Sequence, residues 1–175
     1  MRSKTNKTGV YMIAEGAVIA ALYVALTMLS QALGLTSFAV QFRLSEPLCV
    51  LPYFTFSAVP GLTLGCVLAN ILLASAPWDI VMGSFATFLG ALICRLISSY
   101  LKSMGRNKLA IWISPIPNII TNTLILPPII KWVYGDTMSL LLIALLVLAE
   151  EIVSCALGIP LAFALDKRMK HSFEN

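Results

Sequence analysis

The feature that most constrains the fold is a long apolar run, Leu140–Leu165, which two adjacent acids, Glu150 and Glu151, interrupt near its middle. A helix needs ~20 apolar residues to cross a bilayer, and this run is longer. An ionised carboxylate near the middle of such a helix costs roughly 2.5–3.5 kcal/mol on insertion scales, so it faces the bundle interior, a partner group or a polar cavity. The pair is therefore either a structural polar contact between helices or part of a ligand site.

The composition agrees with an integral membrane protein. Of the 175 residues, 59% are hydrophobic and only 11% are charged, whereas soluble domains carry ~25% charged residues. We expect polar tails at residues 1–9 and 167–175 and a single transmembrane domain at 10–166. The run Val10–Leu33 follows basic residues, as in a signal peptide. It far exceeds a ~7–15-residue signal core, so we predict a first spanning helix there.

Hydrophobic runs and their breaks predict an all-α membrane protein with six transmembrane helices. The second and third runs are short, which indicates offset helices or deep loops, with a turn at Pro60-Gly61 between them. Pro115 and Pro117 predict a kink in the fifth helix, and Gly158 and Pro160 predict a bend in the sixth. The predicted helices are Val10–Leu33, Glu46–Ser57, Leu62–Ala74, Ile80–Leu101, Leu109–Ile130 and Ser139–Leu165.

The basic residues predict the orientation of the chain in the membrane. Three lie in the N-terminal tail, three between the fourth and fifth helices, and three in the C-terminal tail. In this topology the opposite side holds only Arg43 and Lys131. Because Lys and Arg are enriched in cytoplasmic loops, we predict that the N and C termini are both cytoplasmic.

With this topology, polar side chains gather in the outer half and the middle of the bundle, while the inner half is almost wholly apolar. That distribution fits a cup that opens to the outside; an ion channel would be polar along its length. Carboxylates accept paired N–H donors of a flat heterocycle, Asn supplies mixed contacts, and an aromatic ring can stack on it. The candidate substrate-binding residues are Gln41, Arg43, Glu46, Asn70, Trp78, Asp79, Ser84, Asn118, Asn122, Glu150 and Glu151.

Several of these residues have a structural alternative. Asn118 and Asn122 also suit the task of satisfying backbone groups that the two nearby prolines free. Trp78 also suits the aromatic belt at the membrane surface. Arg43 and Glu46, three residues apart, also suit an exposed ion pair worth ~0–1 kcal/mol. The convergence of polar groups, and not any one residue, favours a binding site.

The sequence lacks catalytic and cofactor motifs. Its one histidine, His171, lies in the C-terminal tail, which excludes His-dependent metal chemistry in the membrane. Glu150-Glu151 begins like an EExxxR protease motif, but Cys155 stands where the arginine belongs. No nucleophile elbow, phosphate-binding loop or zinc-ligand spacing is present. We therefore expect no enzyme activity, no cofactor and no metal site, and active transport would take its energy from another subunit or an ion gradient.

Ala17, Ala21 and Ala25 place a small residue at every fourth position of the first predicted helix. Such a stripe lets another helix approach closely. The spacing alone fits packing inside the bundle and docking of a partner helix equally.

Five stretches follow one another along the chain in a specific order. They are Val40–Glu46, Pro60–Asn70, Trp78–Ser84, Pro117-Asn118 with Asn122, and Glu150–Pro160. Together they resemble the QueT family, the substrate-binding S components of energy-coupling-factor (ECF) transporters, over nearly the whole chain. Glu150 matches the acid in the sixth helix of that family. This chain has a second acid, Glu151, which points roughly 100° away on the helix.

The resemblance implies a six-helix, S-component-like bundle in the bacterial plasma membrane that takes up queuosine precursors. These ligands are 7-deazaguanine bases such as queuine. S components have no ATPase of their own and dock to the transmembrane subunit EcfT, which carries two cytoplasmic ATPases. The resemblance also favours the docking interpretation of the alanine stripe, with delivery of the ligand by toppling of the S component in the membrane.

The resemblance further implies roles for the candidate residues. Glu150 would accept N–H donors of a guanine-like edge, Asn118 and Asn122 would orient the ring, and Trp78 would cover it. The outer gate would be lined by Arg43, Glu46 and Asp79. Three alternatives stay open: an S component for another small heterocyclic vitamin, a membrane-embedded enzyme that uses the two adjacent acids as acid and base, and a structural subunit without a ligand.

Overall fold

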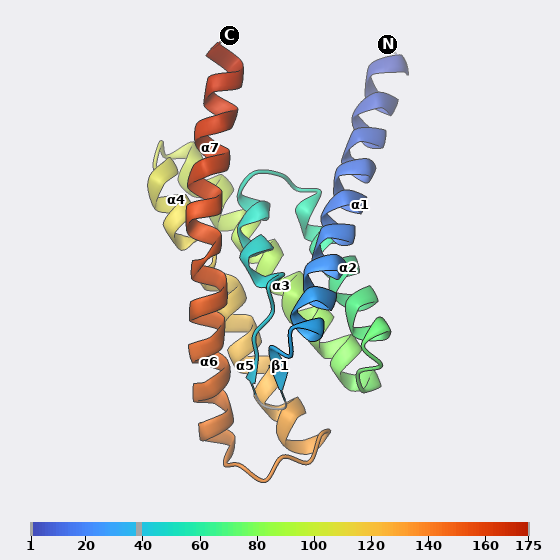
Figure 1. The fold of residues 1–175 in the computed structure, drawn as a ribbon. Helices are drawn as coiled ribbons and strands as arrows, with labels where there is room; N and C mark the ends of the chain where they lie inside the picture. The colour runs from blue at the N-terminus through green and yellow to red at the C-terminus, as the bar shows by residue number, and fades with distance from the viewer. Residues whose placement is uncertain (1, 38–39, 175) are drawn as a thin grey trace.

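A computed structural model of the chain describes the backbone of residues 2–37 and 40–174 and the side chains of residues 9–35 and 42–168. The protein is a bundle of helices in which α1 begins and α7 ends at the same end of the molecule (Figure 1). The elements are α1 (Arg2–Ala32), β1 (Thr36–Ser37), β2 (Val40–Gln41), η1 (Glu46–Tyr53), α2 (Ala58–Leu72), α3 (Pro77–Ser103), α4 (Asn107–Ile113), α5 (Ile116–Trp132), α6 (Leu140–Ala156) and α7 (Gly158–Glu174).

The predicted helical class is confirmed, apart from a short antiparallel hairpin of β1 and β2 that the hydrophobic pattern does not predict. Four stretches of the described chain are long and apolar enough to cross a membrane, and α2 is a shorter apolar helix. These four stretches correspond to the first, fourth, fifth and sixth predicted helices. They are Gly9–Ala32, Pro77–Ser103, Asn107–Trp132 and Leu140–Arg168.

The second predicted helix has a different form in the structure. It is a 3₁₀ helix of eight residues, η1, that ends at Tyr53 and not at Ser57. At ~2 Å per residue it spans roughly 16 Å, about half of a hydrocarbon core. Pro52, inside this segment, has no amide hydrogen to donate, which disfavours a regular α-helix here. The turn predicted at Pro60-Gly61 is also wrong, because both residues lie in the first turn of α2, where proline is tolerated.

The predicted breaks in the last two long helices are confirmed. Ser114 and Pro115 separate α4 from α5, and Leu157 separates α6 from α7. Pro117 and Pro160 each remove one donor from the helical hydrogen-bond ladder next to the break. The fifth and sixth predicted helices therefore consist of two segments each.

Glycines allow α1 and α2 to pack closely. A Cβ atom on Gly61 would lie 2.8 Å from the carbonyl oxygen of Gly16, and a Cβ on Gly65 would lie 2.7 Å from the Cβ of Tyr23. Tyr23 is almost fully buried and belongs to the apolar core between the two helices. The buried face of α1 is thereby fixed toward α2.

The alanine stripe lies on the other face of α1. Ala17, Ala21 and Ala25 are all exposed, whereas Tyr23 and Thr27 are buried. The stripe is thus not used for packing within the described chain. This observation argues against packing inside the bundle as the reason for the alanine spacing.

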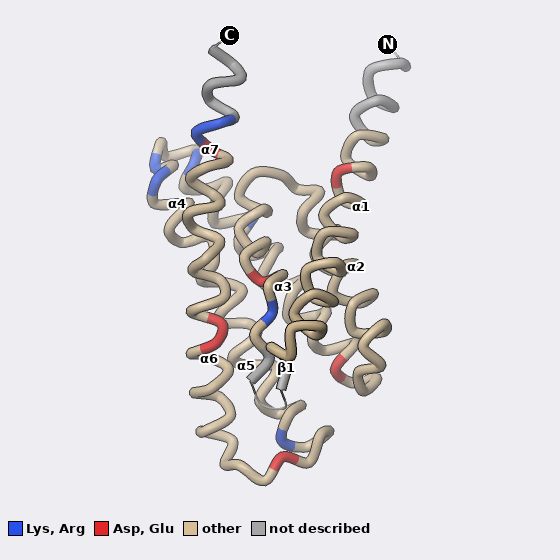
Figure 2. Tube along the Cα trace, viewed as in Figure 1, with Lys and Arg blue, Asp and Glu red and all other residues tan. Residues whose placement is uncertain are grey.

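The charged residues at the ends of the bundle are distributed unequally. Figure 2 shows Lys and Arg in the connection between α3 and α4 and in α7, at the end of the molecule where α1 begins. The cavity described next lies among charged residues toward the middle and the other end. The described part of the structure therefore has one basic end and a charged interior.

Candidate functional site

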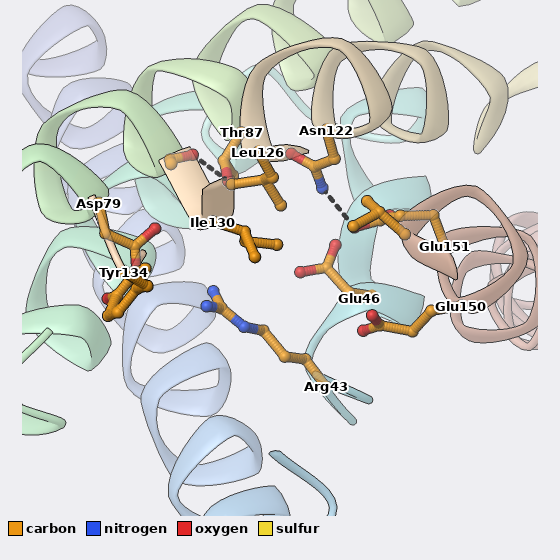
Figure 3. A pocket seen from close by; sticks show the side chains of 12 residues that line it. Arg43, Glu46, Asp79, Thr87, Asn122, Leu126, Ile130, Tyr134, Glu150 and Glu151 are labelled. Atoms are coloured by element: carbon orange, nitrogen blue, oxygen red, sulfur yellow. Dashed lines mark hydrogen bonds between the residues drawn. The ribbon is translucent and has the colours of Figure 1, made fainter. Parts of the chain in front are cut away.

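A cavity lies among α3, α5, α6 and the segment that precedes η1 (Figure 3). Its open space is only about 30 Å³, whereas holding even one water takes roughly 10–15 Å³, because side chains fill most of the cavity. Charged groups inside an apolar bundle mark functional sites by default. The charged lining residues are Arg43, Glu46, Asp79, Glu150 and Glu151; the others are Gly83, Thr87, Asn122, Leu126, Ile130, Tyr134 and Val147.

Glu46 is the buried acid that connects three elements of the fold. Its side chain is 5% exposed. The Tyr23 hydroxyl on α1 donates to Oε1 at 3.2 Å, and the Asn118 amide on α5 donates to Oε2 at 2.8 Å. Both carboxylate oxygens are therefore held in position by neutral donors, which fixes the start of η1 against α1 and α5.

The two adjacent acids of α6 have different surroundings. Glu151 is buried, and its carboxylate accepts hydrogen bonds from the Asn122 amide at 2.7 Å and from the Cys155 thiol at 3.3 Å. Glu150 is only partly buried and points toward the space in front of Glu46 (Figure 3). Glu151 thus links α5 to α6, and Glu150 presents its carboxylate to the cavity.

Tyr134 and Asp79 close another side of the cavity. The Tyr134 hydroxyl donates to Oδ2 of Asp79 at 2.9 Å and accepts from the backbone amide of Ala76 at 3.3 Å. Burial of its ring and the neighbouring Asp79 charge raise the pKa of Tyr134 above its ordinary value. The hydroxyl therefore stays protonated at neutral pH and remains a donor to Asp79.

Replacing Tyr134 with Phe should lower the free energy of unfolding by about 1.5–3 kcal/mol, since a hydrogen bond to a carboxylate is lost while the ring is kept. Thermal unfolding of the purified protein followed by intrinsic fluorescence would measure the change. Tyr100→Phe is the matched control, because the Tyr100 side chain is exposed at the opposite end of α3. Equal unfolding temperatures for Tyr134→Phe and Tyr100→Phe would contradict the assigned contact.

Arg43 brings the positive charge into the cavity. In Figure 3 its side chain reaches into the middle of the view, and its guanidinium group lies between Glu46 and the Asp79–Tyr134 pair. The guanidinium interacts electrostatically with Asp79 and with Glu46. The cavity therefore holds four carboxyl groups around one guanidinium, which balances part of their charge.

Six of the eleven candidate residues line the cavity: Arg43, Glu46, Asp79, Asn122, Glu150 and Glu151. Asn118 is buried behind Glu46 and holds it. The exposed setting considered for an ion pair of Arg43 and Glu46 is wrong, because the Glu46 side chain is buried. The folding of η1 against α1 and α5 carries Glu46 away from the surface.

The remaining candidates lie elsewhere. Trp78 is 65% exposed and does not line the cavity, although the sequence placed it over the ligand. Asn70 and Ser84 are buried beside the cavity, and the Asn70 amide donates to the sulfur of Cys66 at 3.6 Å. The side chain of Gln41 lies outside the described residues.

Three polar residues of the site, Tyr23, Thr87 and Tyr134, are not among the sequence candidates. Tyr134 is not among the sequence candidates, because its position after the fifth predicted helix gives no hint of a contact with the start of α3. Tyr23 stands two residues after Ala21, roughly 200° around the helix, and so faces away from the alanine stripe. That rotation was readable from the sequence and could have identified Tyr23 as an interior polar group.

Glu46, Glu151 and Cys155 bring three possible metal-ligand atoms within 4.8 Å of one another. Each carboxylate already accepts from an amide, and the Cys155 thiol donates to Glu151. This pattern is a closed hydrogen-bond network, and two oxygens with one sulfur suit neither a hard nor a soft cation well. The donor set therefore gives no support for a resident metal.

Comparisons with known proteins point in one direction. The QueT transporter family profile matches residues 13–167. The queuosine precursor transporter QueT of Lactococcus lactis subsp. cremoris (strain MG1363) is 35% identical over 83 residues, which are 47% of this chain and 48% of that protein. The aligned part of the chain thus spans about half the length of this curated relative. No solved structure matches the chain. Because the profile match covers nearly the whole sequence, the chain belongs to the QueT transporter family.

Proposed function

We propose that this protein is the substrate-binding S component of an ECF-type importer and that it captures a queuosine precursor, a 7-deazaguanine base, from outside the cell. Family membership and the printed function of the Lactococcus relative support this proposal. Membership in a transporter family also supports the expectation that the chain is not an enzyme.

The observation that carries the proposal is the convergence of Glu46, Glu150, Glu151 and Asn122 on one cavity. A guanine-like edge presents a ring N–H beside an exocyclic amine, and a carboxylate can accept from both. Glu150 is the best placed acceptor, because its side chain is only partly buried and its carboxylate points into the cavity (Figure 3). Asn122 lies close enough to contact a second edge of the same ring, and Thr87 and Tyr134 offer further polar contacts.

We also propose the membrane topology. The four long apolar stretches, together with η1 and α2, make six membrane-embedded segments, of which η1 and α2 enter only part of the bilayer. An even number of segments agrees with α1 beginning and α7 ending at the same end (Figure 1). The basic residues at that end favour the cytoplasmic side of the plasma membrane, with the cavity reached from outside.

The exposed alanine stripe is the proposed contact with EcfT. Ala17, Ala21 and Ala25 leave a shallow face on α1, and small residues let a partner helix approach closely. The described chain offers no phosphate-binding loop, so the energy for uptake would come from the two ATPases bound to EcfT. Toppling of the loaded S component is the proposed route of delivery.

Binding to the isolated protein tests this function. The purified chain in lipid nanodiscs should bind queuine or a pre-queuosine base with submicromolar Kd in calorimetry, without ATP, because capture precedes energy use. Adenine is the matched control, since it lacks the ring N–H and amine edge of guanine. If only thiamine or riboflavin bound, the ligand would be another heterocyclic vitamin and not a deazaguanine base. Formation of a product during incubation would indicate an enzyme. The absence of binding in a broad ligand screen would favour a structural subunit.

A further inference from the structure

The guanidinium group of Arg43 occupies the space in which a ligand would be expected. It lies between Glu46 and Asp79 in the middle of the cavity (Figure 3). The remaining open space, about 30 Å³, holds a water-sized group but not a bicyclic base. Either the cavity is not the binding site, or side chains move when the ligand enters.

Arg43 and the proposed ligand share their hydrogen-bonding chemistry. A guanidinium presents N–H donors on two nitrogens that flank one carbon, and it pairs with carboxylates through two parallel bonds. The Watson–Crick edge of a guanine-type base presents the same N–C–N unit, with a ring N–H and an exocyclic amine. A pocket that holds the first group is therefore complementary to the second.

The backbone on both sides of Arg43 is anchored, so its side chain is the part that can move. The amide of Phe42 donates to the Leu35 carbonyl at 3.0 Å, and the amide of Leu44 donates to the Ser30 hydroxyl at 2.8 Å. Ser45 accepts from the Thr27 hydroxyl at 2.9 Å. Rotation about the bonds of the Arg43 side chain would clear the space without unfolding the segment.

We infer that Arg43 is a built-in occupant of the ligand site, a guanidine group that the guanidine-like edge of the incoming ligand displaces. This inference rests on the proposed function for the identity of the ligand, but not for the presence of a guanidine-binding pocket. It makes the pocket selective for ligands with an N–C–N donor edge. It also keeps the carboxylates of Asp79 and Glu46 compensated by a positive charge while no ligand is bound.

Chemical replacement of the Arg43 side chain tests the inference. In Arg43→Ala, millimolar methylguanidinium chloride should raise the unfolding temperature relative to equal sodium chloride, whereas the wild type should not respond. Arg106→Ala is the matched control, because Arg106 is exposed in the α3–α4 connection and lies outside the cavity. Arg43→Met retains an unbranched apolar stem and is measured in parallel in case the alanine variant does not fold.

The affinity for the base distinguishes an Arg43 side chain that competes with the ligand from one that contacts the bound ligand. If Arg43 fills the site about 90% of the time, its removal should lower the Kd of a deazaguanine base about tenfold, and methylguanidinium should then compete with the base. A Kd raised tenfold or more, without a methylguanidinium response in either variant, would make Arg43 a ligand contact and overturn the inference. A methylguanidinium response without base binding by any variant would support the guanidine pocket and reject the proposed function.

Discussion

Glu150→Gln is expected to weaken binding of a 7-deazaguanine base about 10- to 150-fold, with little change in the unfolding temperature. The change removes the charge and turns one acceptor of the carboxyl group into a donor that faces the N–H groups of the ligand. Hydrogen bonds to a charged group contribute ~1.5–3 kcal/mol, which converts to this range of Kd. Calorimetric titration of the variant in nanodiscs measures the effect.

Two further substitutions make this result specific. Glu15→Gln is the control, because Glu15 is exposed on α1, where it accepts from Thr55 and lies outside the cavity. Glu151→Gln should also lower the unfolding temperature, since buried Glu151 accepts from Asn122 and Cys155. Unchanged affinity in Glu150→Gln would remove Glu150 from the site and shift the role of ligand acceptor to another lining acid.

Gly158→Ala should destabilise the protein by about 1–3 kcal/mol, the usual cost of overpacking. A Cβ atom at this position would lie 2.5 Å from the carbonyl oxygen of Pro47 and 2.7 Å from a methyl carbon of Val50. The α6–α7 junction would have to move away from η1. Because Pro47 directly follows Glu46, base binding should weaken together with the unfolding temperature.

Gly9→Ala provides the comparison for this variant. A Cβ at Gly9 meets nothing within 4 Å, and alanine is the better helix former, so stability should be equal or slightly higher. Thermal unfolding and base titration on both variants give the two readouts. Full stability of Gly158→Ala would show that the junction can relax, and unchanged binding in a destabilised variant would uncouple η1 from the site.

Much of the fold could be predicted because the bilayer imposes length and polarity on each helix. Long apolar runs identified α1, α3 and the two broken helices, and proline marked both breaks. The form of η1 could not be predicted, because an eight-residue apolar segment with two prolines is compatible with several conformations and is fixed only by packing against α3, α6 and α7. The short β1–β2 hairpin carries no hydrophobic period long enough to be recognised.

The acidic residues of the candidate site could be predicted from the sequence, but their contacts and arrangement could be predicted less well. Buried charge is costly in an apolar bundle, so Glu150 and Glu151 could be predicted from their place in the middle of a long apolar run, whereas the burial of Glu46 could not. The placement of Trp78 over the ligand stays a prediction, because the rotation of the first turn of α3 leaves its side chain 65% exposed and outside the lining of the cavity. Tyr134 was missed because its contact with Asp79 joins the segment after α5 to the first turn of α3, which lies 55 residues earlier in the sequence.

The two hydrogen bonds of Glu46 would make the ligand-bound protein differ from the ligand-free protein at α1 and α5. Its carboxylate cannot shift toward a cargo molecule without lengthening its bond to Tyr23 on α1 or its bond to Asn118 on α5. Tyr23 lies on the same helix as the outward-facing alanines, on the opposite side. If the alanine stripe is the docking face, as proposed, a shift of Glu46 would reach it through Tyr23 and would give a partner a mechanical readout of whether ligand is bound.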